Sequence, residues 1–177
     1  MNAQLSFELR PLHVASHHGH LEISRLLIGN GADVNARAAG DVTTLFQASS
    51  QGHLELVRVL LENGANPNVV CWNDTPLFRA SISNHLELAR LLLEYGADIN
   101  ARDGNGNTLL HRATIRADEK IVRQLLEFGA NIHARDGKGK TPLQIASALE
   151  TQFEGMKDIV LLLQRSAESS SVSLDRQ

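Results

Sequence analysis

The sequence predicts an all-α solenoid of stacked helix pairs, and two observations lead to this fold class. A short block recurs along the chain as GNGADVNAR from Gly29, ENGANPNVV from Glu62, EYGADINAR from Glu94 and EFGANIHAR from Glu127, at spacings of 33, 32 and 33 residues. A second, longer block precedes each of these copies. Self-similarity at a fixed period of about 20 to 50 residues is typical of repeat proteins, in which each unit packs on its neighbours.

The longer block predicts the first helix of each unit. It reads RPLHVASHHGHLE from Arg10, TTLFQASSQGHLE from Thr43, TPLFRASISNHLE from Thr75, TLLHRATIRADEK from Thr108 and, in shorter form, TPLQIASALE from Thr141. The hydroxyls of Thr75 and Thr141 can cap a helix. The prolines that follow them suit the first helical position, where a missing N–H costs nothing. A helix is therefore expected to begin after each of these threonines.

A Leu-rich run predicts the second helix of each unit, and a glycine follows each of the first four runs. A glycine suits the left-handed turn that ends a helix, and these glycines are Gly31, Gly64, Gly96 and Gly129. A small residue recurs in the first helices, at Ala15, Ala48, Ala80, Ala113 and Ala146. A leucine recurs in the second helices, at Leu27, Leu60, Leu92, Leu125 and Leu163. A single unit cannot bury such a face, so the units are expected to stack.

This pattern of Thr-Pro-Leu-His, Gly-His-Leu-Glu and Gly-Ala-Asp-Val-Asn resembles the ankyrin repeat over nearly the whole chain. The resemblance implies antiparallel helix pairs joined by projecting β-hairpin loops, with a concave surface made of hairpins and first helices. The units expected are residues 5–37, 38–70, 71–102, 103–135 and 136–167, of which the third has a shortened hairpin and the fifth, with an insertion in ALETQFEG, forms a C-terminal cap. Residues 1–4 are either the remnant of a preceding repeat or part of a makeshift cap, and residues 168–177 are expected to be a frayed polar tail.

The composition excludes several classes of protein. The formal net charge is −3 and the chain has one cysteine, so neither an internal disulfide nor a Cys-rich zinc site can form. No apolar run approaches the roughly 18 residues of a membrane span, and the first residues lack the features of a signal peptide. We therefore expect a monomer in the cytoplasm or nucleus, with no cofactor and no membrane contact.

The stretch VVCWNDTPLFRA, from Val69, holds the only tryptophan and the only cysteine. The hairpin here is one residue shorter than those that follow Asn35 and Asn100, which places Trp72 at its tip. Trp72 is either an exposed anchor for a partner, since tryptophan is common among binding hot spots, or a brace that lies over the neighbouring hairpins. We favour the partner contact. Cys71 is expected to be a small loop residue, because no His and acid partner can be assigned to it.

The charges differ between the two expected surfaces. Basic residues outnumber Asp103 and Asp136 on the hairpins and first helices, which predicts a basic surface that attracts an acidic segment of a partner protein. The second helices carry Glu and Arg at helical spacing, as on an ordinary solvated face. The expected partner-binding residues are Arg37, Trp72, Asn73, Arg79, Ile82, Arg102, Asn105, Arg112, Ile115, Arg116 and Lys138.

Three further patterns suggest chemistry without supporting it. ARDGKGKT, from Ala134, is close to a phosphate-binding loop but lacks its first glycine and a preceding buried strand. His13, His17 and His20 have the spacing of metal ligands, yet His13 and His20 stand at positions where the family's imidazoles tie loops together, so no metal is expected. Asn35, Asn68 and Asn100 are similar to ankyrin asparagines that asparaginyl hydroxylases modify, although the same side chains can simply brace hairpins.

The sequence therefore predicts a non-enzymatic adaptor, scaffold or inhibitor, because no nucleophile, acid–base pair or metal set indicates catalysis. Two alternatives stay open: a regulatory ankyrin segment of a larger enzyme, or a basic surface that binds a polyanion such as nucleic acid or a phosphorylated ligand. Steep loss of binding with salt would favour the polyanion. The modest net charge favours a protein partner over nucleic acid.

Overall fold

The computed structural model describes the backbone of residues 10–174 and the side chains of residues 10–168. The predicted remnant at residues 1–4, the start of the first repeat and residues 175–177 lie outside the described part. The chain divides into two compact units between Asp98 and Ile99, and each is described by itself. We refer to them as unit 1, which ends at Asp98, and unit 2, which begins at Ile99.

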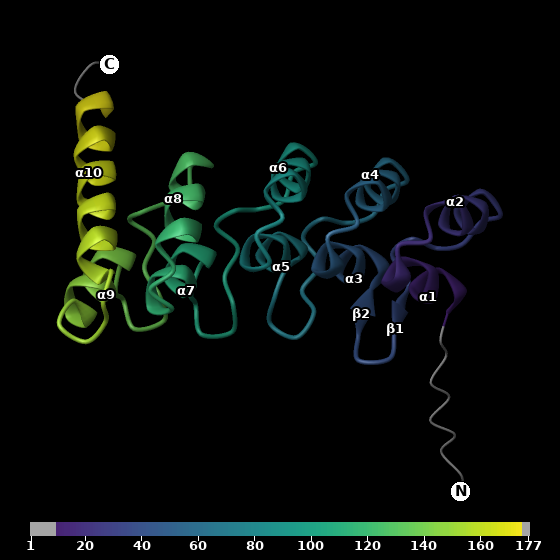
Figure 1. Ribbon diagram of the computed structural model, residues 1–177, viewed down its shortest axis with the longest axis horizontal. Coiled ribbons are helices and arrows are strands. Elements are labelled where there is room, and N and C mark those ends of the chain that lie inside the picture. Colours follow the sequence, from purple (N-terminus) through teal and green to yellow (C-terminus); the bar gives the residue numbers. More distant parts are fainter. Residues whose placement is uncertain (1–9, 175–177) are drawn as a thin grey trace, which may run out of the picture. The chain divides into compact units, whose positions relative to one another are not determined.

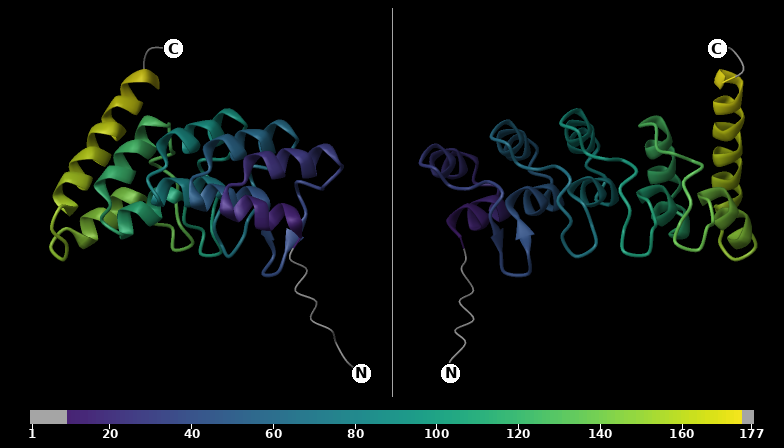
Figure 2. Two further views of the ribbon diagram at one scale, coloured as in Figure 1. Left: turned by 45° about the vertical axis from the view of Figure 1, so that its right-hand side comes forward. Right: turned by 180° about the vertical axis from the view of Figure 1, so that it is seen from behind.

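Unit 1 contains three helix pairs, which are labelled in Figure 1. The first helices are α1 (Pro11–His18), α3 (Thr44–Gln51) and α5 (Pro76–Ile82), and the second helices are α2 (Leu21–Gly29), α4 (Leu54–Glu62) and α6 (Leu86–Glu94). Helix α3 packs between α1 and α5, and α4 packs between α2 and α6. The first and second helices therefore form two parallel layers (Figure 2).

Unit 2 contains two helix pairs of the same design. They are α7 (Leu109–Ile115) with α8 (Glu119–Glu127), and α9 (Pro142–Leu149) with α10 (Met156–Leu174). Helix α7 packs on α9, and α8 packs on α10. The described residues thus form ten helices in five pairs, which confirms the predicted fold class.

The helix boundaries follow from the capping residues. The hydroxyl of Thr75 accepts a hydrogen bond from the N–H of Phe78 at 3.2 Å, and that of Thr141 accepts one from Gln144 at 3.3 Å. Proline occupies the first turn of both helices. The predicted left-handed glycines all have positive φ: Gly31, Gly64, Gly96 and Gly129. Local sequence therefore sets where these two first helices begin and where the chain turns after the second helices.

The core of each unit lies between its two helix layers. In unit 1 the side chains of Ala48, Ala80, Leu60 and Leu92 are fully buried. In unit 2 Ala146 and Leu125 are fully buried, and Leu163 is nearly so. Aliphatic side chains at repeated positions therefore bury the apolar surface that no helix pair could bury alone.

Hairpins connect each second helix to the next first helix. The first hairpin pairs β1 (Arg37–Ala38) with β2 (Val42–Thr43) in antiparallel register, Arg37 opposite Thr43. Isolated antiparallel bridges join Cys71 to Asp74 and Arg102 to Thr108. In unit 1 the hairpins project away from the second helices (Figure 2).

The C-terminal end differs from the prediction. We expected a frayed polar tail from residue 168, but α10 continues as a helix to Leu174. Its residues after Ala167 are mostly serine, which is only moderately unfavourable in a helix, so the preceding turns can propagate through them. Across residues 10–174, every helix is too short or too polar to cross a bilayer.

Candidate partner-binding surface

Trp72 lies at the tip of a two-residue hairpin, as the shortened loop predicted. Cys71 and Asp74 exchange two backbone hydrogen bonds of 2.9 Å, and the two residues between them have positive φ, 52° for Trp72 and 68° for Asn73. This is the geometry of a type I′ turn, which favours Asn and Gly. Asparagine tolerates it, whereas tryptophan does so at a cost of about 1 kcal/mol or more.

The indole of Trp72 is held by its neighbours and is still open to solvent. Its ring meets the buried ring of Phe46 edge-on, with centroids 5.8 Å apart. A Cβ atom on Gly40, in the first hairpin, would lie 3.3 Å from the indole nitrogen. Even so, 64% of Trp72 is exposed. The side chain therefore both braces the neighbouring hairpin and presents an aromatic surface, so the two sequence interpretations are compatible.

Arg79 connects the tryptophan hairpin to helix α3. Its guanidinium lies 5.4 Å from the ring centroid of Phe46 and forms an ion pair of 3.0 Å with Asp74. Asp74 is buried, and Arg79 is about one third exposed. A partly buried pair of this kind is screened less by salt than a surface pair. Arg79, a predicted contact residue, therefore has a structural role as well.

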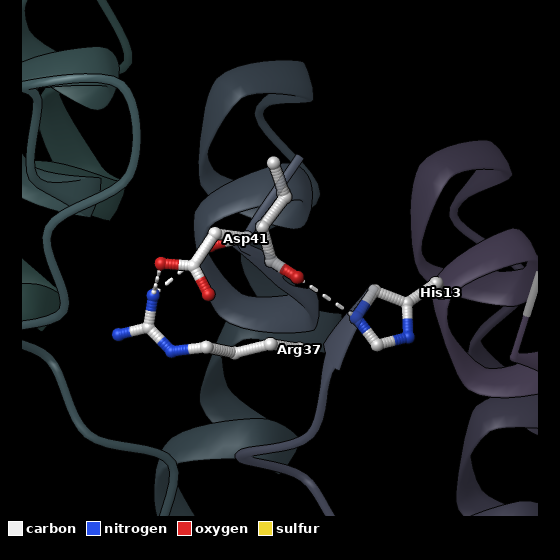
Figure 3. Close-up of polar contacts among 4 residues, drawn as sticks. His13, Arg37 and Asp41 are labelled. Carbon is white, nitrogen blue, oxygen red and sulfur yellow. Dashed lines mark hydrogen bonds and ion pairs between the residues drawn. The ribbon is translucent and has the colours of Figure 1, made fainter. Parts of the chain in front are cut away.

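A second ion pair neutralises the other predicted cation of unit 1. Arg37 bonds to the carboxylate of Asp41 at 2.5 Å and to the backbone oxygen of the same residue at 3.0 Å (Figure 3). The sequence count of opposing charges omitted both Asp41 and Asp74. Unit 1 is therefore less basic on its hairpins than the count of arginines indicated, because each of these two cations faces a carboxylate.

The hairpins of unit 2 pack backbone against backbone. The N–H of Gly137 donates to the carbonyl oxygen of Asn105 at 3.0 Å. A Cβ on Gly106 would lie 2.7 Å from the Gly137 nitrogen, and one on Gly137 would lie 2.5 Å from the Asn105 oxygen. Arg102 donates to Gly106 and to Arg135. These contacts hold the two hairpins together without large side chains.

The aspartates of these hairpins are saturated by backbone donors. Asp103 accepts from the N–H groups of Asn105 and Asn107, both at 2.9 Å. Asp136 accepts from Lys138 at 2.9 Å and from Lys140 at 2.8 Å. The N–H of Lys140 is the main reason that the pKa of Asp136 lies below its ordinary value. The carboxylates that oppose the cations of unit 2 are therefore committed to turn formation.

A cleft of about 670 Å³ opens beside these hairpins, within the size range of ligand sites. It brings together three predicted residues, since Asn105, Ile115 and Lys138 line it. Ile115, at the end of α7, is 45% exposed, and the adjacent Arg116 is also exposed. Three glycines also line the cleft, Gly104, Gly106 and Gly137. The sequence analysis did not assign them to a site, because their pattern indicated only turns.

Three predicted contact residues remain, on helices α5 and α7 and on the tryptophan hairpin. Ile82 is the last residue of α5 and is half-buried, and Arg112 is half-buried on α7. Asn73 is exposed beside Trp72. Trp72 and Arg79 both contact the ring of Phe46, whereas Ile82 lies at the C-terminal end of α5. Whether any predicted residue contacts a partner stays a prediction.

The three asparagines proposed for hydroxylation brace successive repeats. Asn35 donates to the oxygen of Gly64 at 2.8 Å and accepts from the N–H of Asn66 at 2.8 Å. Asn68 makes the same pair of bonds to Gly96 and Asp98, at 2.9 and 2.7 Å. Asn100 accepts from the N–H of Asn131. Their bracing role is a feature of the fold, and hydroxylation stays a prediction.

Of the N-terminal histidines, His13 is buried, whereas the ring of His18 lies beside those of both His17 and His20. His13 bonds through Nε2 to the oxygen of Val42 at 3.1 Å (Figure 3). Burial lowers the pKa of His13, although the bond to Val42 acts in the opposite direction. His17 and His18 are exposed, with ring centroids 4.9 Å apart. Within the described residues no three His, Cys, Asp or Glu side chains converge as metal ligands would.

Comparison with known proteins identifies the repeats. A family model described as ankyrin repeats (3 copies) matches residues 12–103 and 101–172. A search of curated proteins gave no match. The family match spans both units and includes every described hairpin.

Proposed function

Because the chain belongs to the ankyrin-repeat family, whose repeats generally mediate protein–protein interaction, we propose that it binds a partner protein through its hairpins and first helices. In this role it is an adaptor, scaffold or inhibitor of the cytoplasm or nucleus, and the proposal assigns it no catalytic step. The fold leaves the loops free for recognition, because the stacked helices carry the stability.

Trp72 is the observation that carries the proposal. Its large aromatic side chain is 64% exposed, although such side chains are usually buried. Its backbone has a positive φ, which tryptophan rarely adopts. Strained conformations of this kind cluster at functional sites. Tryptophan also supplies a large contact area at a low entropic cost, which is why it is common among interface hot spots. We infer that the exposed indole is the anchor for the partner.

The cleft of unit 2 offers a cation beside an apolar side chain. Lys138 lies in its wall and Lys140 is exposed in the same hairpin, and the ionised carboxylate of Asp136, which also lines the cleft, accepts hydrogen bonds from the backbone N–H groups of both lysines. Ile115 adds an apolar contact. An acidic segment with an aliphatic side chain would find both kinds of partner there, and its charge would speed its association.

Affinity capture from native lysate, read by mass spectrometry, tests the proposal. Wild type is compared with Trp72→Ala and with Tyr95→Ala, a control that removes an aromatic ring 39% exposed at the end of α6. Proteins retained by wild type and by Tyr95→Ala, and lost with Trp72→Ala, are the expected result. An identical set of proteins in all three captures would contradict the role of Trp72.

A salt series on the captured partner separates protein binding from polyanion binding. Phosphate contacts release counterions, so a nucleic acid would be lost steeply between about 50 and 200 mM salt. We expect binding of the partner to depend only weakly on salt concentration, because salt ions do not screen an apolar contact with an indole. Capture that survives nuclease treatment and responds to Arg116→Glu would support an acidic protein segment.

A further inference from the structure

The chain contains three Asn-Gly pairs, the dipeptide in which an asparagine most readily loses its side-chain amide group. They are Asn30-Gly31, Asn63-Gly64 and Asn105-Gly106. Glycine favours the reaction because it has no side chain, so its backbone nitrogen can reach the side-chain carbon of the preceding residue. The dipeptide is the same at all three places, so the surrounding fold decides which pair reacts.

The reaction needs an asparagine side chain that can turn towards the glycine. The backbone nitrogen of the glycine forms a bond to Cγ of the asparagine, and the bond between Cγ and the amide nitrogen breaks. The glycine nitrogen gives up its proton, and the amide nitrogen leaves as ammonia. Water then opens the cyclic succinimide to give aspartate or, more often, isoaspartate. Water is the only co-reactant.

Two of the three pairs are held at the ends of helices α2 and α4, where the asparagine is the C-cap residue. Each side-chain amide donates to the backbone oxygen four residues earlier, at 2.7 Å for Asn30 and 2.8 Å for Asn63. The N–H of the next residue donates to the last turn of the same helix, at 2.9 Å for Gly31 and 3.0 Å for Gly64. Ring closure would break both of these bonds.

Asn105 lies instead in an exposed loop of unit 2. Among the hydrogen bonds of the described residues, only its backbone takes part. The N–H of Gly106 donates to the oxygen of Asp103 at 2.9 Å, so the glycine nitrogen is bonded in all three pairs. The free side-chain amide is therefore what sets Asn105 apart. Bonds within a surface loop also open locally at a lower free-energy cost than bonds onto a packed helix.

We propose that Asn105 is a deamidation site of this chain, whereas the fold protects Asn30 and Asn63. Either product places a new negative charge in the cleft of unit 2, because Asn105 lines it. The proposal does not depend on the proposed function, since the reaction needs no partner protein.

The isoaspartate product also disturbs the contact between the two hairpins of unit 2. The carbonyl oxygen of Asn105 accepts the N–H of Gly137 at 3.0 Å. In isoaspartate the main chain runs through the side-chain carbon, so it is longer and this carbonyl becomes part of a carboxylate. A Cβ on Gly106 would already lie 2.7 Å from the Gly137 nitrogen, so the lengthened chain has no room. The hairpins are therefore expected to separate as the site ages.

Ageing of the purified full chain at mildly alkaline pH tests the site. Trypsin places the three pairs on separate peptides, residues 26–37, 59–79 and 103–112, and mass spectrometry measures the deamidated fraction of each. Fragment ions separate Asn105 from Asn107, and an unaged sample corrects for deamidation during digestion. Asn105 should react at least about fivefold faster than Asn30 and Asn63, since one hydrogen bond changes a rate by about this factor.

The same ageing in urea is the control for sequence context. The three pairs should then react at similar rates, because the fold no longer holds two of them. Equal rates in the folded protein, or the same preference for Asn105 in urea, would overturn the proposal.

The variant Asn105→Gln tests the structural consequence, because glutamine closes the corresponding ring far more slowly. After ageing until Asn105 is converted, wild type should melt about 2 to 4 °C lower than before. Aged Asn105→Gln should keep its initial melting temperature. Full conversion of Asn105 to isoaspartate with no change in melting temperature would overturn the expected separation of the hairpins.

Discussion

The ring of Trp72 stands edge-on against the ring of Phe46, with centroids 5.8 Å apart and planes 89° apart. Phe46 is almost fully buried, whereas Trp72 is mostly exposed. The guanidinium of Arg79 also lies against Phe46 and pairs with Asp74, which flanks the tryptophan turn. One buried ring thus fixes the position of one exposed ring, so the indole is oriented before any partner arrives.

The two rings should respond differently to truncation. Phe46→Ala should lower the free energy of unfolding by about 3 to 5 kcal/mol, because it opens a cavity in the core. Trp72→Ala should cost much less, about 1 kcal/mol, since most of the ring is exposed and alanine bears the same strain at positive φ. Urea unfolding of both variants measures the difference. Similar losses would show that Trp72 is mainly a structural residue.

Two glycines in unit 2 allow the cost of a close contact between backbones to be measured apart from the cost of backbone strain. Gly106 and Gly139 have the same φ of 75°, but only Gly106 would place a Cβ against another backbone, 2.7 Å from Gly137. Gly139→Ala should cost about 1 kcal/mol from strain alone. Gly106→Ala should cost about 1 to 3 kcal/mol more, because the hairpins must move apart. Equal melting temperatures for the two variants would contradict the close packing.

The stability of the fold should depend on the side-chain amide of Asn35 as a hydrogen-bond donor. In Asn35→Asp the carboxylate keeps the bond from Asn66 but faces the oxygen of Gly64, which lies 2.8 Å from the amide nitrogen. A loss of about 1 to 3 kcal/mol is expected in urea unfolding. Asn105→Ala is the control, because only the backbone of Asn105 takes part in the described hairpin bonds. A neutral Asn35→Asp change would argue against the bracing role.

His13 should make stability depend on pH. Burial lowers its pKa in the folded state below the ordinary value of 6.5. The unfolded chain therefore binds the proton more readily, and stability falls as pH drops below about 6.5. Between about pH 7.5 and pH 5.5, wild type should lose more unfolding free energy than His13→Gln, whose side chain does not titrate. Parallel pH profiles for the two proteins would contradict this effect, since all other histidines are common to both.

The repeat pattern predicted most of the fold because its signals are local. The threonine caps, the glycine turns and the buried alanines each depend on a few neighbouring residues, and the structure confirms them. The shortened hairpin placed Trp72 correctly at a tip. Its positive φ was not foreseen, because the turn type depends on how the flanking strands pair.

The charges of the site were harder to predict. Whether Arg37 and Arg79 are available to a partner depends on Asp41 and Asp74, which come close to the arginines only when the hairpins form. The approach of Gly106 to Gly137 joins two repeats and leaves no composition signal beyond turn residues. The length of α10 depends on helix propagation into serines that a sequence pattern alone identifies as a tail.

Fluorescence of Trp72 tests the central claim most directly, because it is the only tryptophan of the chain. A captured partner is titrated into the purified protein, with the signal of the partner alone subtracted. Binding at the hairpin surface should shift the indole emission to shorter wavelengths and protect it from acrylamide quenching, since a covered indole loses contact with water. A saturated complex in which emission and quenching match those of the free protein would contradict the account.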